Sequence, residues 1–366
     1  MNASGLNVGV VGGTGYSGGE LCRLLLAHPA VDKILPTSRG DQPFERNHRN
    51  LLGCGLEFVT PEQLLADVGD LDVVFFCTPT GEAMSVVERY LDHGVRVIDL
   101  SADFRFGDPD TYRAAHGLEH TAPHLLTEAV YGISELNRER VRSARLVANP
   151  GCYVITAVLG LAPLLTSGMA SLDAPLHVSA INGTTGASST PKRDVMHPHV
   201  FGSILPYNME GHRHAPELED VLGALTERRL TVDLNTAHGD FARGIYVQAS
   251  VPLLSSARHK VDQSVLSDLY EQAYGAGHDG EHFVLLNDFP KSGKLNAKDY
   301  DVYPSVAAVR GSNFCHLGVD YDESRGIAKV IAVTDNLVKG AAGSAIQNMN
   351  TMFELPEIEG LRHYGA

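Results

Sequence analysis

A glycine-rich turn near the start of the chain constrains the fold more than any other feature. In LNVGVVGGTGYSGGELCRLLL, a β-branched apolar run comes before the glycines, and Leu21, Leu24 and Leu25 follow them at helical spacing. The turn satisfies G-x-G-x-x-G between a strand and a helix, the context in which this pattern binds a dinucleotide pyrophosphate. A turn that serves packing alone is the alternative. The residues expected to bind the cofactor here are Gly12, Gly13, Thr14, Gly15, Tyr16, Ser17 and Gly18.

Strand-like and helix-like segments alternate over about the first 150 residues. DKILPTS, DLDVVFFCTPT and VRVIDLSADF read as strands, and AMSVVERYLDHG reads as a helix closed by glycine. This alternation predicts an α/β fold with a Rossmann-type, doubly wound parallel sheet. After an apolar segment, closely spaced strands predict an α+β domain with a mostly antiparallel sheet. These strands are LHVSAIN, TVDLNTAH, GIYVQASVPLL, EHFVLLND, SVAAVRGSNFCHLGVDYD and IAKVIAVTDN, and the helical tail LVKGAAGSAIQNMNTMFEL follows them.

The end of the second expected strand selects the cofactor. It reads Thr37-Ser38-Arg39, where an NAD-dependent enzyme usually places an acidic residue for the ribose hydroxyls. A hydroxyl and a guanidinium suit a 2′-phosphate instead, so NADP(H) is expected, with contacts from Ser38 and Arg39. Asp41 lies close by, and a solvated arginine is the alternative interpretation.

Cys152 is the candidate nucleophile. It follows Asn-Pro-Gly and precedes the apolar run YVITAVLGLAPLL, which places it at the expected start of a helix. A helix N-terminus lowers the pKa of a thiol through its exposed N–H groups and dipole. A buried, inert cysteine is the alternative, and it suits Cys22, Cys54 and Cys77.

A histidine pair supplies a candidate partner for the thiol. His212 and His214 in YNMEGHRHAPELEDVL stand directly before an expected helix, and histidine titrates in the range that acid–base catalysis needs. Metal binding is the competing interpretation, because H-x-H recurs at His197 and His199. Zinc sites with four protein ligands add cysteines or further histidines at set spacing, and none is evident, so no metal is expected.

The formal net charge of −15 disfavours binding to nucleic acids and to anionic membranes. The N-terminus has no signal-peptide pattern, and the longest apolar run, 154–165, is too short to span a bilayer. The five cysteines form no C-x-x-C pair and no even framework. We therefore expect a cytoplasmic protein.

Taken together, the chain resembles the N-acetyl-γ-glutamyl-phosphate reductases, within the wider aspartate-semialdehyde dehydrogenase group, over essentially its whole length. The matching stretches are GVVGGTGYSGGELCRLL, TSR, FFCTPTG, DLSADFR, EAVYGISELNRERV, NPGCY, YNMEGHRHAPELE, VRGSNFC and TDNLVKGAAGSAIQNMN. The resemblance implies a homo-oligomer, dimer or tetramer, that reduces an acyl phosphate to an aldehyde with NADPH. It also implies three segments: an NADP-binding domain (1–150), a catalytic and dimerisation domain (151–335), and a C-terminal helix that returns to the first domain (336–366).

The resemblance also assigns roles to residues. It makes Cys152 the nucleophile that forms a thioester and His214 the acid–base, with His212 on the cofactor side and Asn336 near the nicotinamide. It adds Cys77, Thr78 and Pro79 to the cofactor site, and Asn149 and Gly183 to the substrate site. The substrate carries a phosphate and a carboxylate, for which the candidate cations are Arg105, Lys192, Arg193 and Arg213. Each of these cations has a solvated-surface alternative.

The chain departs from the family pattern in two places. Val154 follows Cys-Tyr where the family usually has proline, and a loop that usually reads S-G-x-S-G-A-G is N-G-T-T-G-A-S from Asn182 to Ser188. The stretch that follows, STPKRDVMHPHVFGSILPYNMEGHRH, resembles the branch that acts on 2-aminoadipate or glutamate phosphates held by a small acidic carrier protein. The free N-acetylated substrate is the leading expectation, and the carrier-linked one is the alternative.

Two further interpretations remain open at the level of sequence. One is a non-catalytic NADP-binding sensor that kept the fold, which the presence of Cys152 and His214 disfavours. The other is a phosphorylating aldehyde dehydrogenase that works in the oxidative direction with the same groups.

Overall fold

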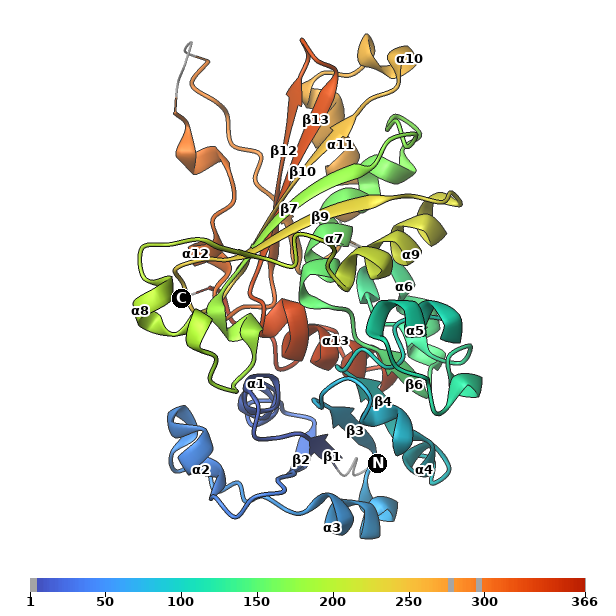
Figure 1. Ribbon diagram of the computed structural model, residues 1–366, viewed down its shortest axis with the longest axis vertical. Helices are drawn as coiled ribbons and strands as arrows, with labels where there is room; N and C mark the ends of the chain where they lie inside the picture. The colour runs from blue at the N-terminus through green and yellow to red at the C-terminus, as the bar shows by residue number, and fades with distance from the viewer. Residues whose placement is uncertain (1–4, 276–279, 294–297, 366) are drawn as a thin grey trace. The chain divides into compact units, whose positions relative to one another are not determined.

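The computed structural model describes residues 5–275, 280–293 and 298–365 and divides the chain into two compact units. Unit 1 spans Met1–Gly151 and Ala341–Arg362, and unit 2 spans Cys152–Gly340 and His363–Ala366. Figure 1 colours the chain from blue at the N-terminus to red at the C-terminus. Helix α13 (Gly343–Met352) belongs to unit 1 although it is the last element of the chain. It packs against β4 (Arg96–Asp99), α1 (Tyr16–Leu25) and α6 (Ser134–Ser143) of that unit.

Unit 1 is built on a six-stranded sheet in which every pair of neighbours is parallel, in the order β2-β1-β3-β4-β6-β5. The chain passes from β1 to β2 on one side and then to β3 on the other, which places a topological switch point between β1 and β3. In such sheets, ligands bind beyond the carboxyl ends of the strands at the switch point. The strands are β1 (Leu6–Val11), β2 (Val31–Pro36), β3 (Val73–Phe76), β4 (Arg96–Asp99), β5 (Val130–Tyr131) and β6 (Leu146–Ala148).

The helices of unit 1 begin and end where local chemistry requires. Thr60 and Gln63 form a reciprocal capping box at the start of α3, and α5 ends at Gly117, whose φ of 67° favours glycine. The helices are α1 (Tyr16–Leu25), α2 (Phe44–Asn47), α3 (Pro61–Ala66), α4 (Val87–Leu91), α5 (Pro109–His116), α6 (Ser134–Ser143) and α13.

The helix expected over AMSVVERYLDHG is interrupted. A 3₁₀ turn at Ala83–Ser85 precedes α4, and Val86 between them has non-helical angles. Two polar groups favour this break: the Asp103 carboxylate accepts from the backbone N–H groups of Gly81 and Met84, and the Ser85 hydroxyl donates to the Glu82 carbonyl. The apolar periodicity of the sequence does not register such hydrogen bonds.

Asp99, at the carboxyl end of β4, is fully buried beside Asp103. Burial raises the pKa of the Asp99 carboxyl to about 7, and the nearby Asp103 charge contributes to this increase. The folded protein therefore holds a proton that the unfolded chain releases near pH 3.8. The stability that this proton contributes is complete below pH 3.8 and is lost as the pH rises to about 7.

Asp99→Asn should therefore gain stability relative to the unsubstituted protein as the pH rises. Between pH 5 and pH 8, the difference in unfolding free energy between the two proteins should move in favour of the variant by about 2.5 kcal/mol. Urea unfolding followed by circular dichroism at both pH values measures this change. A difference that stays constant with pH would show that Asp99 is ionised throughout.

Unit 2 is built on a mixed, mostly antiparallel seven-stranded sheet in the order β11-β12-β13-β10-β7-β9-β8. β7 pairs with β9, and β11 with β12, in parallel; the other pairings are antiparallel. The structure confirms the predicted fold class: a domain built on a parallel sheet and an α+β domain with a mostly antiparallel sheet. The strands are β7 (Leu176–Asn182), β8 (Leu205–Tyr207), β9 (Val232–His238), β10 (Ile245–Pro252), β11 (Val284–Leu286), β12 (Cys315–Asp322) and β13 (Ile327–Thr334).

One strand prediction in unit 2 was too long. The stretch SVAAVRGSNFCHLGVDYD begins with a short helix, α12 (Val306–Val309), and only its second half forms β12. Gly311, at φ 82°, lies between the two, and a backbone angle of that kind interrupts a strand. Two further short helices in unit 2 are α8 (His197–Val200) and α10 (Ser255–Arg258).

Three longer helices, α7 (Cys152–Thr166), α9 (His214–Thr226) and α11 (Gln263–Tyr274), pack with the sheet of unit 2 (Figure 1). Helix α7 is apolar around its whole circumference, because sheet and helices surround it. Pro163 has no N–H for the Leu159 carbonyl, and the hydroxyl of Tyr274 donates to that oxygen instead at 2.9 Å. The helix that starts at Cys152 is thus firmly anchored.

Candidate functional site

The glycine turn of unit 1 lies at the switch point of its sheet. Gly12 follows β1 directly and has a φ of 84°, which favours glycine. A Cβ on Gly12 would lie 2.5 Å from the carbonyl oxygen of Cys77, the residue that follows β3. The glycine turn and the segment Cys77-Thr78-Pro79 are therefore packed backbone to backbone, which brings two of the expected cofactor segments together.

The geometry of this turn fits a dinucleotide pyrophosphate. Helix α1 begins after Gly15, and within the part of the chain that the structure describes no side chain caps its first N–H groups, which suits them to an anion. A Cβ on Gly18 would lie 2.5 Å from the Gly12 carbonyl, so the helix can approach the turn only through a glycine. The Thr78 hydroxyl is buried and has no hydrogen-bond partner among the residues that the structure describes. Such a group is suited to bind the cofactor.

His48, which the sequence analysis did not select, forms a hydrogen bond with this turn. His48 is buried, and its Nε2 lies 2.7 Å from the carbonyl oxygen of Gly13. A Cβ on Gly19 would lie 2.3 Å from the imidazole, so this glycine makes room for the ring. The loop between β2 and α3 thereby fixes the turn.

Arg39 lies in the loop just after β2 (Val31–Pro36), where the 2′-phosphate of NADP is expected. Its side chain is 74% exposed, and Nη2 lies 2.6 Å from Oε2 of Glu82. Ser38 is buried, and its hydroxyl is hydrogen-bonded with Gly40. An exposed guanidinium held by one carboxylate can bind a phosphate.

Cys152 is the first residue of α7, as expected from Asn-Pro-Gly. Within unit 2, the Nδ2 atom of Asn182 lies 3.8 Å from its Sγ. Gly340 lies against it, because a Cβ on that glycine would be 2.9 Å from the Cβ of Cys152. Thr156 donates to the Cys152 carbonyl and lies 2.7 Å from the Thr334 hydroxyl, which ties the first turn of α7 to the end of β13.

The two histidines adjoin Cys152 through Tyr153. The ring of Tyr153 makes edge-to-face contacts with His212 (5.5 Å between centroids) and His214 (5.8 Å). His214 begins α9, and its backbone N–H donates to Nδ1 of His212. Burial, assisted by the Arg213 charge, lowers the pKa of His212 to about 4, so this histidine is neutral at pH 7 and accepts at Nδ1.

His214 has a different electrostatic environment. It is buried, and its Nε2 lies 3.9 Å from Oε2 of Glu217, which is also buried one turn later in α9. A carboxylate at that distance offers a countercharge to the imidazolium that forms when His214 takes a proton. His214 therefore differs from His212 in having a buried acidic neighbour one turn away in the same helix.

The site contains aromatic residues that sequence reasoning missed. The Tyr153 and Tyr207 hydroxyls are 3.0 Å apart, and Tyr207 stacks on His238 at 4.6 Å. Burial raises the pKa of both tyrosines and lowers that of His238. Tyr153, Tyr207 and His238 therefore form an uncharged aromatic cluster at the site. The sequence could not indicate this cluster, because Tyr207 and His238 belong to separate strands.

Asn336, expected near the nicotinamide, is fixed on both sides of its amide. Its Oδ1 accepts from the Gly244 N–H, and its Nδ2 donates to Thr185 Oγ1 at 2.9 Å. Asp335 before it is fully buried, pairs with Arg243, and accepts from the N–H groups of Leu337 and Val338. The segment from Asp335 to Gly340 is thereby held in place beside Cys152.

The side chains of two residues expected to bind substrate form hydrogen bonds with other residues of unit 1. Arg105 donates to the carbonyls of Leu100 and Asn149. Asn149 is buried, donates to the Ala341 carbonyl, and accepts from Ser344 and Asn348. These bonds connect the strand ends to α13.

The other expected substrate residues lie in unit 2. Gly183 follows Asn182 and packs on Ala242, whose carbonyl oxygen would be 2.5 Å from a Cβ. Lys192, Arg193 and Arg213 are exposed; the first two precede α8, and Arg213 immediately precedes α9. The residues expected to bind the cofactor are divided, because His212 and Asn336 belong to unit 2 and the others to unit 1.

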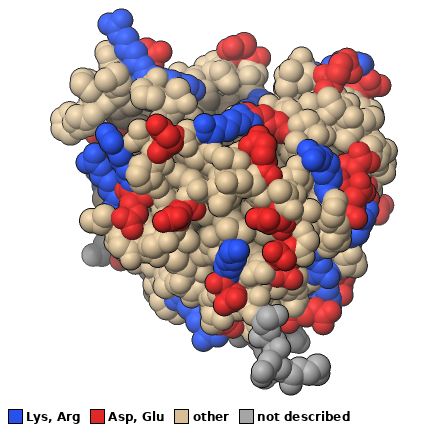
Figure 2. Space-filling view, turned by 90° about the horizontal axis from the view of Figure 1, so that it is seen from below, with Lys and Arg blue, Asp and Glu red and all other residues tan. Residues whose placement is uncertain are grey.

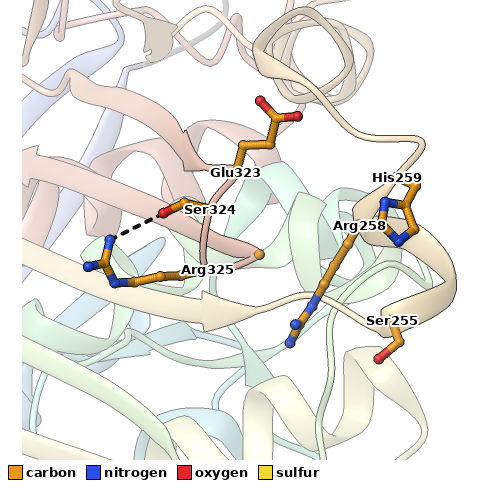
Figure 3. A pocket seen from close by; sticks show the side chains of 7 residues that line it. Ser255, Arg258, His259, Glu323, Ser324 and Arg325 are labelled. Atoms are coloured by element: carbon orange, nitrogen blue, oxygen red, sulfur yellow. Dashed lines mark hydrogen bonds between the residues drawn. The ribbon is translucent and has the colours of Figure 1, made fainter. Parts of the chain in front are cut away.

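A separate hollow of about 590 Å³ lies around α10 and the β12–β13 turn (Figure 3). Its arginines are engaged: Arg258 donates to the Leu253 carbonyl, and Arg325 donates to Asp322 and Ser324. None of the candidate residues lines it. The lining residues are Ser255, Arg258, His259, Glu323, Ser324, Arg325 and Gly326.

Three further features of the structure concern metal-ligand clusters, membrane-spanning helices and surface charge. Over the described residues, no three or more His, Cys, Asp and Glu side chains gather as metal ligands would. No helix in the described part of the chain is long and apolar enough to cross a membrane. On the face seen in Figure 2, acidic and basic side chains are interspersed.

Comparison with known proteins matches both parts of the chain to domain families. Residues 7–144 match the semialdehyde dehydrogenase, NAD binding domain. Residues 152–336 match the semialdehyde dehydrogenase, dimerisation domain. The first match contains the glycine turn, and the second begins at Cys152.

Similar proteins cover almost the whole chain. N-acetyl-gamma-glutamyl-phosphate reductases from Acidithiobacillus ferrooxidans and Azotobacter vinelandii are 39% and 40% identical, over 97% and 98% of this chain and 98% of their own. Among solved structures, aspartate semialdehyde dehydrogenase II from Vibrio cholerae, complexed with ASA, superposes with a TM-score of 0.70 at 16% identity, over 96% of this chain and 98% of that one. That likeness shows a shared fold.

Proposed function

The chain belongs to the N-acetyl-gamma-glutamyl-phosphate reductase family, and on that premise we propose that it reduces N-acetyl-γ-glutamyl phosphate to N-acetylglutamate 5-semialdehyde with NADPH. This reaction is a step of arginine biosynthesis. The observation that carries the proposal is the position of Cys152 at the start of α7, beside Asn182 and the Tyr153–His212–His214 cluster. Five free thiols support a cytoplasmic location.

The proposed chemistry begins at Cys152. His214 takes the thiol proton, and the sulfur attacks the acyl carbon. The carbon–oxygen bond to the phosphate then breaks, phosphate leaves with the electron pair, and a thioester remains on Cys152. Backbone N–H groups at the start of α7 are suited to stabilise the oxyanion of the tetrahedral intermediate.

Bound NADPH supplies the hydride that reduces the thioester carbonyl. On this chain, the glycine turn and Thr78 would hold the cofactor in unit 1, and the Asn336 carboxamide, fixed by Gly244 and Thr185, would position the nicotinamide end. The carbon–sulfur bond then breaks and releases the aldehyde. His214 returns its proton to the sulfur, which restores Cys152.

Arg39 is proposed to select NADPH over NADH. Arg39→Ala should raise the Kd for NADPH by roughly 10- to 100-fold and leave that for NADH nearly unchanged, because only NADPH carries the 2′-phosphate. Fluorescence titration of the purified protein with each cofactor measures both constants. Arg46→Ala, on α2, is the control. Equal losses for the two cofactors would contradict the assignment.

Homo-oligomers are proposed through the sheet of unit 2. The match to a dimerisation domain supports this, and so does the alternation of buried and more exposed residues along β7 and β10. One face of these strands packs on α7, and the other presents Ile181, Tyr246 and Gln248. A second copy would cover that face.

The experiment that tests the proposed function runs the reaction in reverse. Phosphate-dependent reduction of NADP⁺ is measured with purified protein and N-acetylglutamate 5-semialdehyde. Turnover that requires phosphate supports the free substrate. Absence of turnover, with NADPH still bound, would overturn it.

A carrier-linked substrate is a second candidate, favoured by the surface beside the site. The segment between the Gly183 loop and α9 carries Lys192 and Arg193, and Phe201 on it is 71% exposed. Such a surface suits a macromolecular partner. The same reverse assay with a carrier-linked semialdehyde distinguishes the two substrates.

A further inference from the structure

Asn182 places a buried carboxamide beside the reactive sulfur. It is the last residue of β7, the residue is 2% exposed, and its Nδ2 lies 3.8 Å from Sγ of Cys152. Hydrogen bonds to sulfur are longer than those to oxygen. A thiolate only accepts hydrogen bonds, so an amide N–H directed at it stabilises the charged form relative to the thiol.

The backbone of Asn182 is fixed from both sides. β7 lies between β9 and β10, and Asn182 is in register with His238 on one and Ile245 on the other. Its carbonyl accepts from the Gly239 N–H, and the next residue, Gly183, donates to Gly244. The side chain therefore starts from a rigid position in the interior of the sheet.

Packing also holds the amide in place. A Cβ on Gly186 would lie 2.2 Å from Nδ2, so any larger residue at that position would displace the amide from its place. The Oδ1 atom is buried and has no hydrogen-bond partner within the described part of the chain. A buried amide that leaves one atom unsatisfied costs stability, and a catalytic role explains why such a group is kept.

We propose that Asn182 is a further catalytic residue, whose amide N–H stabilises the Cys152 thiolate. This inference rests on the proposed role of Cys152 as the nucleophile. It gives a function to the first residue of the loop that departs from the family pattern. The titratable or charged groups that the structure describes around this part of unit 2 include Tyr153 on α7, Tyr207 on β8, His238 on β9, and His212, Arg213, His214 and Glu217 at the start of α9.

Alkylation of Cys152 by iodoacetamide tests the inference without substrate or cofactor. The rate is followed from pH 5 to 10, and peptide mass spectrometry separates Cys152 from the other four cysteines. Asn182→Ala should slow alkylation at pH 7 about tenfold and move the midpoint of the profile up by about one pH unit, because a hydrogen bond to a charged group is lost. Asn287→Ala, which removes a carboxamide at the end of β11, should follow the unsubstituted protein.

A second variant guards against a change in folding. Asn182→Ser keeps a small hydroxyl donor, and its alkylation midpoint should lie between those of the Ala variant and the unsubstituted protein. Thermal melting of each variant checks that it is folded. An unchanged alkylation profile in folded Asn182→Ala would overturn the inference.

Turnover separates this inference from the proposed function. If Asn182→Ala shifts the alkylation profile while the unsubstituted protein does not act on N-acetylglutamate 5-semialdehyde, the thiolate role stands and the proposed substrate fails. If the unsubstituted protein is active and Asn182→Ala alkylates and turns over normally, the proposed function stands and the role of Asn182 fails.

Discussion

Cys152→Ser is expected to lower kcat by roughly 10⁴-fold or more while the Kd for NADPH stays unchanged. A serine hydroxyl fits the same space at the start of α7, but it is far less acidic than a thiol and yields almost no nucleophile at neutral pH. The glycine turn and Thr78, proposed to bind the cofactor, belong to unit 1 and are untouched by the change. Steady-state kinetics and NADPH fluorescence titration measure the two effects.

The control for this substitution is Cys54→Ser, which makes the same chemical change in unit 1 and should retain nearly full activity. Burial raises the pKa of a second cysteine, Cys22, to about 12, so that thiol is not a ready substitute nucleophile. If the Cys152→Ser variant kept more than a tenth of the normal kcat, the reaction could not depend on a thioester formed on Cys152.

His214→Gln is expected to lower kcat by about 10²- to 10⁴-fold, because the thiol loses the group that takes and returns its proton. Helix α9 should form as before, since the backbone N–H at 214 still donates to Nδ1 of His212. The variant should also lose the acidic limb of its pH–rate profile. Measurement of kcat from pH 5 to 9 checks both effects.

His212→Gln is the matched comparison. Because the pKa of His212 is lowered to about 4, this residue is neutral throughout that range and cannot produce a limb above pH 5. The variant should keep the acidic limb and affect KM for NADPH more than kcat. If the limb disappears in His212→Gln and persists in His214→Gln, the acid–base role belongs to His212.

The sequence predicted correctly the features that depend on local chain geometry. The glycine turn follows β1, and Cys152 opens α7, because both positions are set by a few neighbouring residues. The order of strands and helices also predicted both sheets. The break before α4 was missed because the Asp103 carboxylate that accepts from the Gly81 and Met84 N–H groups lies in the segment after β4, distant in sequence from the break.

The rest of the site depends on contacts between distant segments. Asn182 and His238 are in register only through the parallel pairing of β7 and β9, and Gly340 reaches Cys152 from the far end of the domain. Arg39 could be selected from its position after a strand, whereas its ion pair with Glu82 could not. Neither spacing nor composition encodes these pairings.

If Cys152 is the nucleophile, it carries the acyl group during turnover, and that intermediate can be trapped. Purified protein is mixed with N-acetyl-γ-glutamyl phosphate without NADPH, quenched in acid, digested and analysed by mass spectrometry while released phosphate is counted. We expect one acyl group on the Cys152 peptide and a burst of one phosphate per active site, both absent in Cys152→Ser. Phosphate release without an adduct, or an adduct on another residue, would contradict it.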